Sequence, residues 1–251
     1  MQALDWLRQH RNQAIRSVQP LPGLTACSRL VELESGEHYV LRTQTAKADN
    51  YGIDYRQEAV LLRYLAPLGF VPTVIYADAD SALLNWIEGD TPDIFTDTLL
   101  KALAERLVQL HSVPLQAVGF GQHFATLDLA ERCLSLWNNL PQTKRQQLDF
   151  SPPFKRIAPF RQAICHHDIH LANLVEQDGR LFLIDWEYAA VSDPALELGL
   201  FLHANSLSAM QQAVFFDHYF AKSGINRTAC LRKMAEYQPE IEKLNALWFA
   251  L

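Results

Sequence analysis

The sequence lacks the closely spaced cysteine pairs that build disulfide frameworks and zinc knuckles. Its four cysteines, Cys27, Cys133, Cys165 and Cys230, are widely spread, and none belongs to a C-x-x-C motif. This spacing argues against a disulfide-stapled fold and against a cysteine-bound structural zinc. We therefore expect reduced thiols in a cytoplasmic protein.

Long apolar runs and clusters of basic residues are also missing. No stretch approaches the roughly 18 apolar residues that a membrane-spanning helix needs, and the first residues contain no signal-peptide core. The net charge is -6, and no Lys/Arg run of the kind that follows a phosphate backbone occurs. We expect no secretion, no membrane insertion and no nucleic-acid partner.

The composition that remains is that of an ordinary globular protein. Hydrophobic residues make up 49% of the 251 residues and charged residues 20%, which is enough for a substantial core and argues against disorder. The length fits one large domain or two small ones that share a cleft.

The first third of the chain alternates between helix and strand patterns. Apolar spacing predicts a helix over 2–16, and two β-rich arms around a turn predict a hairpin over 28–43. The polar stretch 43–50 has the composition of a loop, and helical spacing resumes over 52–68. Two short apolar runs within 71–87 predict a second strand pair.

The rest of the chain has a mainly helical pattern. Helices are predicted over 95–111, over 126–139 and from 194 to the end, after a linker near 87–93. One hairpin interrupts them over 173–186, where two apolar arms flank an Asp-Gly turn.

The densest polar chemistry surrounds that hairpin, in the segment CHHDIHLANLVEQDGRLFLIDWEYA. Asp168, Asn173 and Asp185 offer only oxygen ligands, which suit a hard cation such as Mg²⁺ beside phosphate oxygens. An aspartate that receives the acceptor's proton and an Asn/Asp pair that holds metal are the parts that phosphoryl transfer requires. Their order and approximate spacing match the catalytic and metal loops of protein kinases.

The same segment resembles the aminoglycoside phosphotransferase and choline kinase superfamily. HHDIHLAN is similar to its H-x-D-x-x-x-x-N element, and IDWEYA to its metal-binding segment; together with ALEL they most resemble the bacterial thiamine kinase branch. The resemblance implies an α+β, protein-kinase-like fold of two lobes. Residues 1–87 are expected to form a small β-rich lobe that clamps the nucleotide, and 88–251 a larger, mainly α-helical lobe that carries catalysis and acceptor binding.

The resemblance also implies roles for individual residues, with ATP and Mg²⁺ as cofactors. Asp168 corresponds to the catalytic base, His166 to a residue that braces the catalytic loop, and Asn173 and Asp185 to the metal ligands.

On the nucleotide side, Arg42 in HYVLRTQ resembles the basic residue presented to the phosphates, and Glu58 resembles its acidic anchor. The phosphate loop departs from the kinase pattern, because PLPGLTACSRLVE offers a single glycine, Gly23, where a glycine series allows close backbone approach. Residues expected to meet adenine at the hinge are Asn85, Trp86 and Ile87.

The acceptor is expected to be a small alcohol, and a positively charged one. Trp186, Glu187 and Tyr188 follow the metal aspartate directly, and aromatic faces beside a carboxylate suit a cation. Trp137 and Trp248 are further candidates for the pocket. Thiamine is the first candidate by resemblance, choline or ethanolamine the second, and an aminoglycoside a third; the oligomeric state has no signature in the sequence.

Other interpretations stay open at this point. His166, His167 and His170 beside Asp168 could bind zinc or iron in a metallohydrolase. A nucleotide-binding protein without catalysis is compatible with the glycine-poor loop. Aspartate and asparagine also serve as turn and cap residues, lone charges such as Arg42 often lie on a solvated face, and aromatic residues at strand ends often pack in the core.

Overall fold

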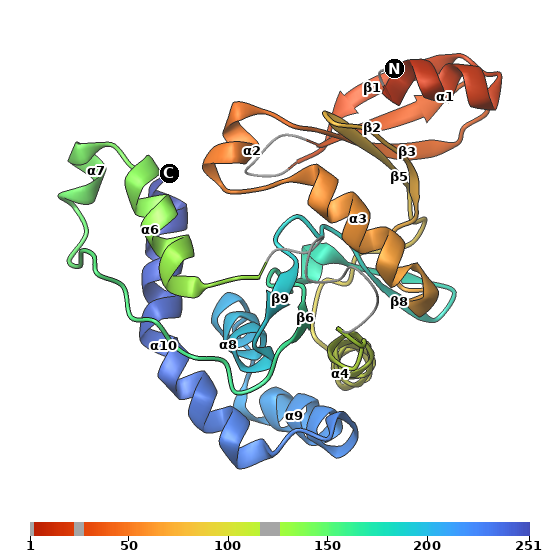
Figure 1. Cartoon of the computed structure of the whole chain (residues 1–251). Coiled ribbons are helices and arrows are strands. Elements are labelled where there is room, and N and C mark those ends of the chain that lie inside the picture. The colour runs from red at the N-terminus through yellow and green to blue at the C-terminus, as the bar shows by residue number, and fades with distance from the viewer. Residues whose placement is uncertain (1–2, 23–27, 116–125) are drawn as a thin grey trace.

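The structure is a computed structural model that describes residues 3–22, 28–115 and 126–251. Strands dominate the first part of the chain and helices the remainder, and the two parts form neighbouring layers (Figure 1). This arrangement confirms the predicted α+β, kinase-like fold. Gly23, the predicted phosphate-loop glycine, lies outside the described residues.

The first part is built on one antiparallel sheet of five strands. Its two predicted hairpins are present, and β3 pairs with β5 so that the hairpins form a single sheet. From edge to edge the strands are β1 (Ile15–Pro20), β2 (Ser28–Leu33), β3 (His38–Thr43), β5 (Ser81–Asn85) and β4 (Val74–Ala77).

Two predictions for this part were wrong. The first helix, α1 (Ala3–Arg11), ends before the positive φ of Asn12, and the residues after it form β1. Ile15 and Val18 favour this outcome because β-branched side chains suit a strand that packs beside β2. The stretch expected to be a loop contains a short helix, α2 (Ala46–Asn50), whose first turn is capped by the side chain of Thr45.

Helix α3 (Tyr55–Leu65) packs against the sheet and carries a charged residue inward. Asp54 caps its N-terminus by accepting hydrogen bonds from Arg56 N and Gln57 N, and its apolar face is buried. Because Glu58 lies on this buried face, its carboxylate points to the interior instead of solvent. A 3₁₀ turn, Ala66–Leu68, ends the helical segment.

The connection between the two parts is fastened to a hairpin. Asp90 and Glu176 exchange two backbone hydrogen bonds, of 3.0 and 2.9 Å, and so join the connection to β7 (Leu174–Gln177), which pairs with β8 (Arg180–Leu183). Gly89, at φ 153°, permits this approach because a Cβ there would overlap the carbonyl oxygen of Glu176. The predicted boundary near 87 falls within this connection.

The second part consists of helices around a small core of strands. Its elements are α4 (Asp97–His111), α6 (Leu129–Asn139), α7 (Gln142–Arg145), α8 (Pro194–Ala204), α9 (Ala209–Ser223), α10 (Arg227–Ala250), the 3₁₀ turn Leu171–Asn173, and the pair β6 (Ala163–Cys165) and β9 (Ala190–Ser192). The β6–β9 pair was not predicted, because strands of three residues buried on every side show no alternation. None of the described helices combines the length and apolarity needed to span a membrane.

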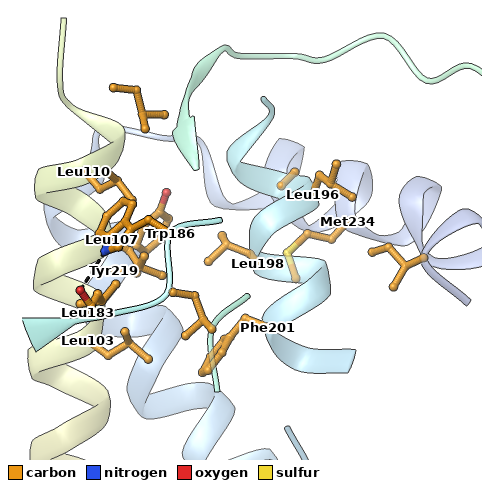
Figure 2. Close-up of a cluster of buried hydrophobic side chains, with 14 of the residues drawn as sticks. Leu103, Leu107, Leu110, Leu183, Trp186, Leu196, Leu198, Phe201, Tyr219 and Met234 are labelled. Carbon is orange, nitrogen blue, oxygen red and sulfur yellow. Dashed lines mark hydrogen bonds between the residues drawn. The ribbon is translucent and has the colours of Figure 1, made fainter. Parts of the chain in front are cut away.

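The core of this second part lies between α4, α8, α9 and α10. Leu103, Leu107 and Leu110 line one face of α4 and pack toward Leu183 and Tyr219 (Figure 2). The β7–β8 hairpin is thereby fixed on the helices, and so are the polar loops that leave it.

Gly89→Ala tests the close contact between the connection and β7. We expect it to lower the free energy of unfolding by on the order of 1–3 kcal/mol through backbone strain, and further through overlap with Glu176 O. Urea unfolding measures the change. Gly36→Ala is the control, because Gly36 also has a positive φ but no heavy atom lies near its Cβ position. Equal losses in the two variants would contradict the assigned contact.

Candidate active site

The loop after β6 brings two of the predicted residues together. The side-chain amide of Asn173 donates to the backbone oxygen and to Oδ2 of Asp168, both at 2.9 Å. Burial acts to raise the pKa of Asp168, but the hydrogen bond and charge of His170 outweigh it, so the pKa lies below its usual value. Asp168 is therefore an ionised carboxylate at neutral pH, held in one orientation.

His166 joins this loop to the segment that carries Asp185. The backbone N–H of Asp168 donates to His166 Nδ1 at 3.3 Å, so Nε2 carries the proton that is donated to Ile184 O at 3.0 Å. Burial lowers the pKa of His166 and favours the neutral ring. The backbone N–H of Ile184 also donates to Asn173 O, at 3.0 Å. His166 thus lies behind the loop as a positioning residue.

Arg42 links the sheet to the same segment. Its guanidinium lies 3.2 Å from Glu58 Oε1, 2.7 Å from Asp185 Oδ1 and 3.3 Å from Glu187 Oε2, and it is only 5% exposed. The predicted Arg42–Glu58 pair is therefore present as an ion pair. The additional contacts of Arg42 with Asp185 and Glu187, in the second part of the chain, were not predicted.

The charges around Arg42 do not balance. Burial raises the pKa of Glu58 to about 7, and burial together with the charge of Asp185 raises the pKa of Glu187 to about 8. Burial, together with the neighbouring carboxylates, stabilises the protonated forms of Glu58 and Glu187. Such an excess of carboxylate oxygen suits a site that also receives a cation.

The donor set fits Mg²⁺. Asn173 uses its amide nitrogen on Asp168, which leaves its amide oxygen as a ligand, and Asp185 supplies a carboxylate at a positive φ of 64°. Oxygen ligands of this kind, few in number and next to a cleft, are what Mg²⁺ uses when substrate phosphates complete its shell.

The predicted hinge residues are the last residue of β5 and the two residues that follow it. Asn85 pairs with Thr73 through its backbone N–H and its side-chain oxygen, and its side-chain amide donates to Trp86 O at 3.2 Å. Ile87 is buried, and Trp86 donates its backbone N–H to His38 O. The adenine role of these three residues stays a prediction.

A cavity of about 710 Å³ opens beside Asp168. Residues from both parts of the chain line it, among them Gly52 and Asp54 before α3, Arg132 on α6 and Trp248 on α10. A volume of this size holds a metabolite-sized ligand. Six carboxylates line the cavity: Asp54, Glu58, Asp128, Glu131, Asp168 and Glu187.

The three residues after Asp185 all line the cavity, but their surroundings differ, and their role in acceptor binding stays a prediction. Trp186 is 1% exposed, packs against His166 and donates its indole N–H to Leu183 O, so most of this side chain belongs to the core (Figure 2). Glu187 is tied to Arg42 and to the hydroxyl of Tyr55.

The two tryptophans predicted as further pocket residues lie in different places. Trp248 lines the cavity and donates its indole N–H to the Tyr188 hydroxyl at 3.2 Å. Trp137 instead packs with Phe150 and Phe154 and is not among the residues that line this cavity.

The histidines do not converge as a metallohydrolase requires. Both ring nitrogens of His166 are engaged in the loop, and His167 donates Nδ1–H to Tyr188 O at 3.1 Å. Within the described part of the chain, the one set of three potential metal ligands is His111, Cys165 and Glu197. His111 in that set is already bonded, at Nδ1 to Tyr219 OH and at Nε2 to Glu197.

Glu197 is the functional residue that the sequence analysis missed. Its carboxylate is fully buried on α8, where it accepts hydrogen bonds from the backbone N–H groups of His166 and His167 and pairs with His111. The sequence offers one indication of this role: Glu197 is the single charged residue in the apolar run PALELGLFL, where a charge is expected to be buried and paired. Asp193 caps α8 and accepts hydrogen bonds from Phe160 N and Tyr237 OH.

The pKa of Glu197 makes its contribution depend on pH. Burial acts to raise this pKa, but the hydrogen bond and charge of His111, with the His167 N–H, lower it to about 2 from 4.5. A carboxyl whose pKa is depressed in the folded state stabilises the fold above its unfolded pKa, and this stabilisation is lost as the pH falls toward the folded value.

We therefore expect Glu197→Gln to reduce the free energy of unfolding by on the order of 3 kcal/mol at neutral pH. The difference from the unmodified chain should shrink as the pH falls from about 4.5 toward 2. Urea unfolding at several pH values measures it. A difference that is constant over this range would contradict the buried, ionised carboxylate.

Comparison with known proteins agrees with this geometry. The model of the family described as "Phosphotransferase enzyme family" matches residues 18–237. The chain is 28% identical over 237 residues to a thiamine kinase of Shigella boydii serotype 4, which covers 90% of this chain and 79% of the relative. It is 27% identical over 175 residues to a LicA homolog of Metamycoplasma hominis, 67% of each chain.

A solved structure, that of the choline kinase LicA from Streptococcus pneumoniae, has a TM-score of 0.73 at 19% identity and covers 98% of this chain and 88% of its own. At this identity the likeness shows the fold. Together with the matched family and the kinase relatives, it confirms the predicted resemblance. The chain belongs to the phosphotransferase enzyme family and is a small-molecule kinase.

Proposed function

We propose that this kinase transfers the γ-phosphoryl group of ATP to the hydroxyl of a small cationic alcohol, with thiamine as the first candidate. The observation that carries the proposal is the position of Asp168, which is bonded to Asn173 on one side and lines the acceptor cavity on the other. A carboxylate between a metal-binding pair and a pocket can orient a hydroxyl toward a phosphate.

Different residues of the chain have different roles in the proposed transfer. Asp168 accepts the hydroxyl proton of the acceptor and aims its oxygen, while His166 and Glu197 hold the loop from behind. Asn173 and Asp185 would hold Mg²⁺, which neutralises charge on the phosphate oxygens when it is bound. Arg42, which is anchored by Glu58 and contacts Asp185, would pair with the same phosphates.

The charge of the cavity supports a cationic acceptor. Six carboxylates line it, and five of them pair with an arginine: Glu58 and Glu187 with Arg42, Asp54 with Arg56, and Asp128 and Glu131 with Arg156. Among the described residues Asp168 is the one lining carboxylate without an arginine partner, so its charge is the one that remains for a cation. Thiamine carries a permanent positive charge and a primary hydroxyl, and the thiamine kinase relative aligns over most of this chain. Choline or ethanolamine is the second candidate, supported by the LicA relatives, and an aminoglycoside remains a third.

Asp168→Asn tests the catalytic role. We expect turnover to fall by on the order of 10²–10⁴, because the amide cannot accept the hydroxyl proton, while ATP binding is retained. Steady-state assays of ADP release and calorimetric titration with ATP measure the two quantities separately.

Asp185→Ala is the matched comparison for Asp168→Asn, since it removes a proposed metal ligand instead of the base. It should weaken binding of magnesium ATP as well as turnover. Unchanged turnover in a folded Asp168→Asn variant would refute the role of Asp168.

A panel of acceptors tests the substrate. With magnesium ATP we expect kcat/KM to decrease from thiamine to choline to a neutral alcohol of similar size, because charge attraction to the acidic cavity is worth roughly tenfold to a hundredfold. Choline ahead of thiamine would favour the second candidate. A neutral alcohol ahead of both would reject a cationic acceptor, and zinc-dependent phosphoester hydrolysis without ATP would reject the kinase.

A further inference from the structure

Arg132 is a cation within an acidic cavity. It projects from α6 into the cavity lining, where its guanidinium lies 5.6 Å from the centre of the Tyr188 ring. Its Nη1 donates to the backbone oxygen of Gly52 at 3.3 Å. The face of Tyr188, predicted to receive a cationic substrate, is therefore already covered by a cation of the chain itself.

Among the described residues, the guanidinium of Arg132 has no carboxylate partner. Arg42 contacts three carboxylates, whereas no carboxylate oxygen of the described residues lies within 4.0 Å of Arg132. Its single described hydrogen bond uses one of five N–H donors. Removal from water also lowers the pKa of Arg132. Donors that are half-buried at a cavity wall gain from any acceptor atom that a ligand brings to them.

The position of Arg132 is fixed before a ligand arrives. Gly52 has a φ of 65°, and a Cβ at this residue would overlap Nη1 of Arg132. The guanidinium thus fits against bare backbone on one side and against the Tyr188 ring on the other. A side chain held in this way loses little conformational entropy when a ligand binds.

We propose that Arg132 is a specificity-determining residue that donates a hydrogen bond to an acceptor atom on the substrate, at the end opposite the hydroxyl that is phosphorylated. This inference rests on the proposed function. The carboxylates of the cavity attract the positive charge of the substrate. Arg132 donates a hydrogen bond to an uncharged hydrogen-bond acceptor elsewhere on the same substrate. Thiamine has such a group in the ring nitrogens of its pyrimidine, whereas choline offers no acceptor besides its hydroxyl.

The test compares thiamine with a thiazolium alcohol in which a benzyl group replaces the aminopyrimidylmethyl group. Both compounds carry the same charge and the same hydroxyl, but only thiamine can accept a hydrogen bond from Arg132. For the unmodified chain we expect kcat/KM for thiamine to exceed that for the benzyl compound by roughly tenfold to a hundredfold. In Arg132→Met this preference should disappear through a loss on thiamine alone.

Two further variants make the result specific. Gly52→Ala leaves Arg132 in the chain but displaces its guanidinium, so it should also reduce the preference, and it replaces Arg132→Met if that variant does not fold. Arg145→Met is the control, because Arg145 likewise lies over an aromatic ring, that of Trp137, but does not line the cavity. It should keep the preference of the unmodified chain.

The outcomes separate the two proposals. Equal turnover of both compounds by the unmodified chain, or a preference that survives in both Arg132→Met and Gly52→Ala, overturns the role of Arg132 and leaves the proposed function standing. No turnover of either compound, with choline phosphorylated, overturns thiamine as substrate and the role of Arg132 with it.

Discussion

The buried guanidinium of Arg42 is the constraint on which the rest of the site depends. It comes from the sheet, yet two of its three carboxylate partners, Asp185 and Glu187, belong to the segment after β8. A buried charge without partners is far more costly than the same charge in water, so this arginine and these carboxylates must stay together. The sheet is thereby held over the segment that carries Asp185 and Glu187. Glu58 completes the set from α3, and it also accepts the backbone N–H of Trp186.

A second buried carboxylate, that of Glu197, holds the loop that carries Asp168 in place. Glu197 binds two successive backbone N–H groups of that loop and is itself paired with His111 on α4. Charge-assisted hydrogen bonds to backbone groups are stronger than neutral ones and fix geometry as well as energy. His167 needs such support because its φ of 67° is unfavourable for a residue with a side chain. Asp168, the next residue, is therefore presented from a loop whose backbone has one available conformation.

The sequence allowed the fold class and the chemistry of the loop to be predicted, but not the walls of the pocket. Asp168, Asn173 and Asp185 lie within a few residues of one hairpin, so their spacing predicts that they are close together, and the structure shows Asn173 bonded to Asp168. Arg132 has no such signature, because its importance arises only when α6 is placed opposite Gly52 and Tyr188. The aromatic residues after Asp185 were ambiguous for the same reason. A position at the end of a strand does not predict how deeply a ring is buried: both Trp186 and Tyr188 line the cavity, but Trp186 is almost fully buried in the core.

Several arginines cross between the two parts of the chain, and two of them, Arg42 and Arg132, border the site from opposite directions. Arg42 reaches from the sheet to Asp185, and Arg132 reaches from α6 back to the backbone of Gly52. The first crossing contacts Asp185, a proposed metal ligand, and the second lies in the wall of the cavity beside Asp168. Asn139 adds a hydrogen bond of 2.8 Å to Asn50 O next to the second crossing. A change in the distance between the two parts therefore alters the Arg42–Asp185 contact and the Arg132–Gly52 contact together. The geometry around Asp185 and the geometry of the cavity are coupled in this way.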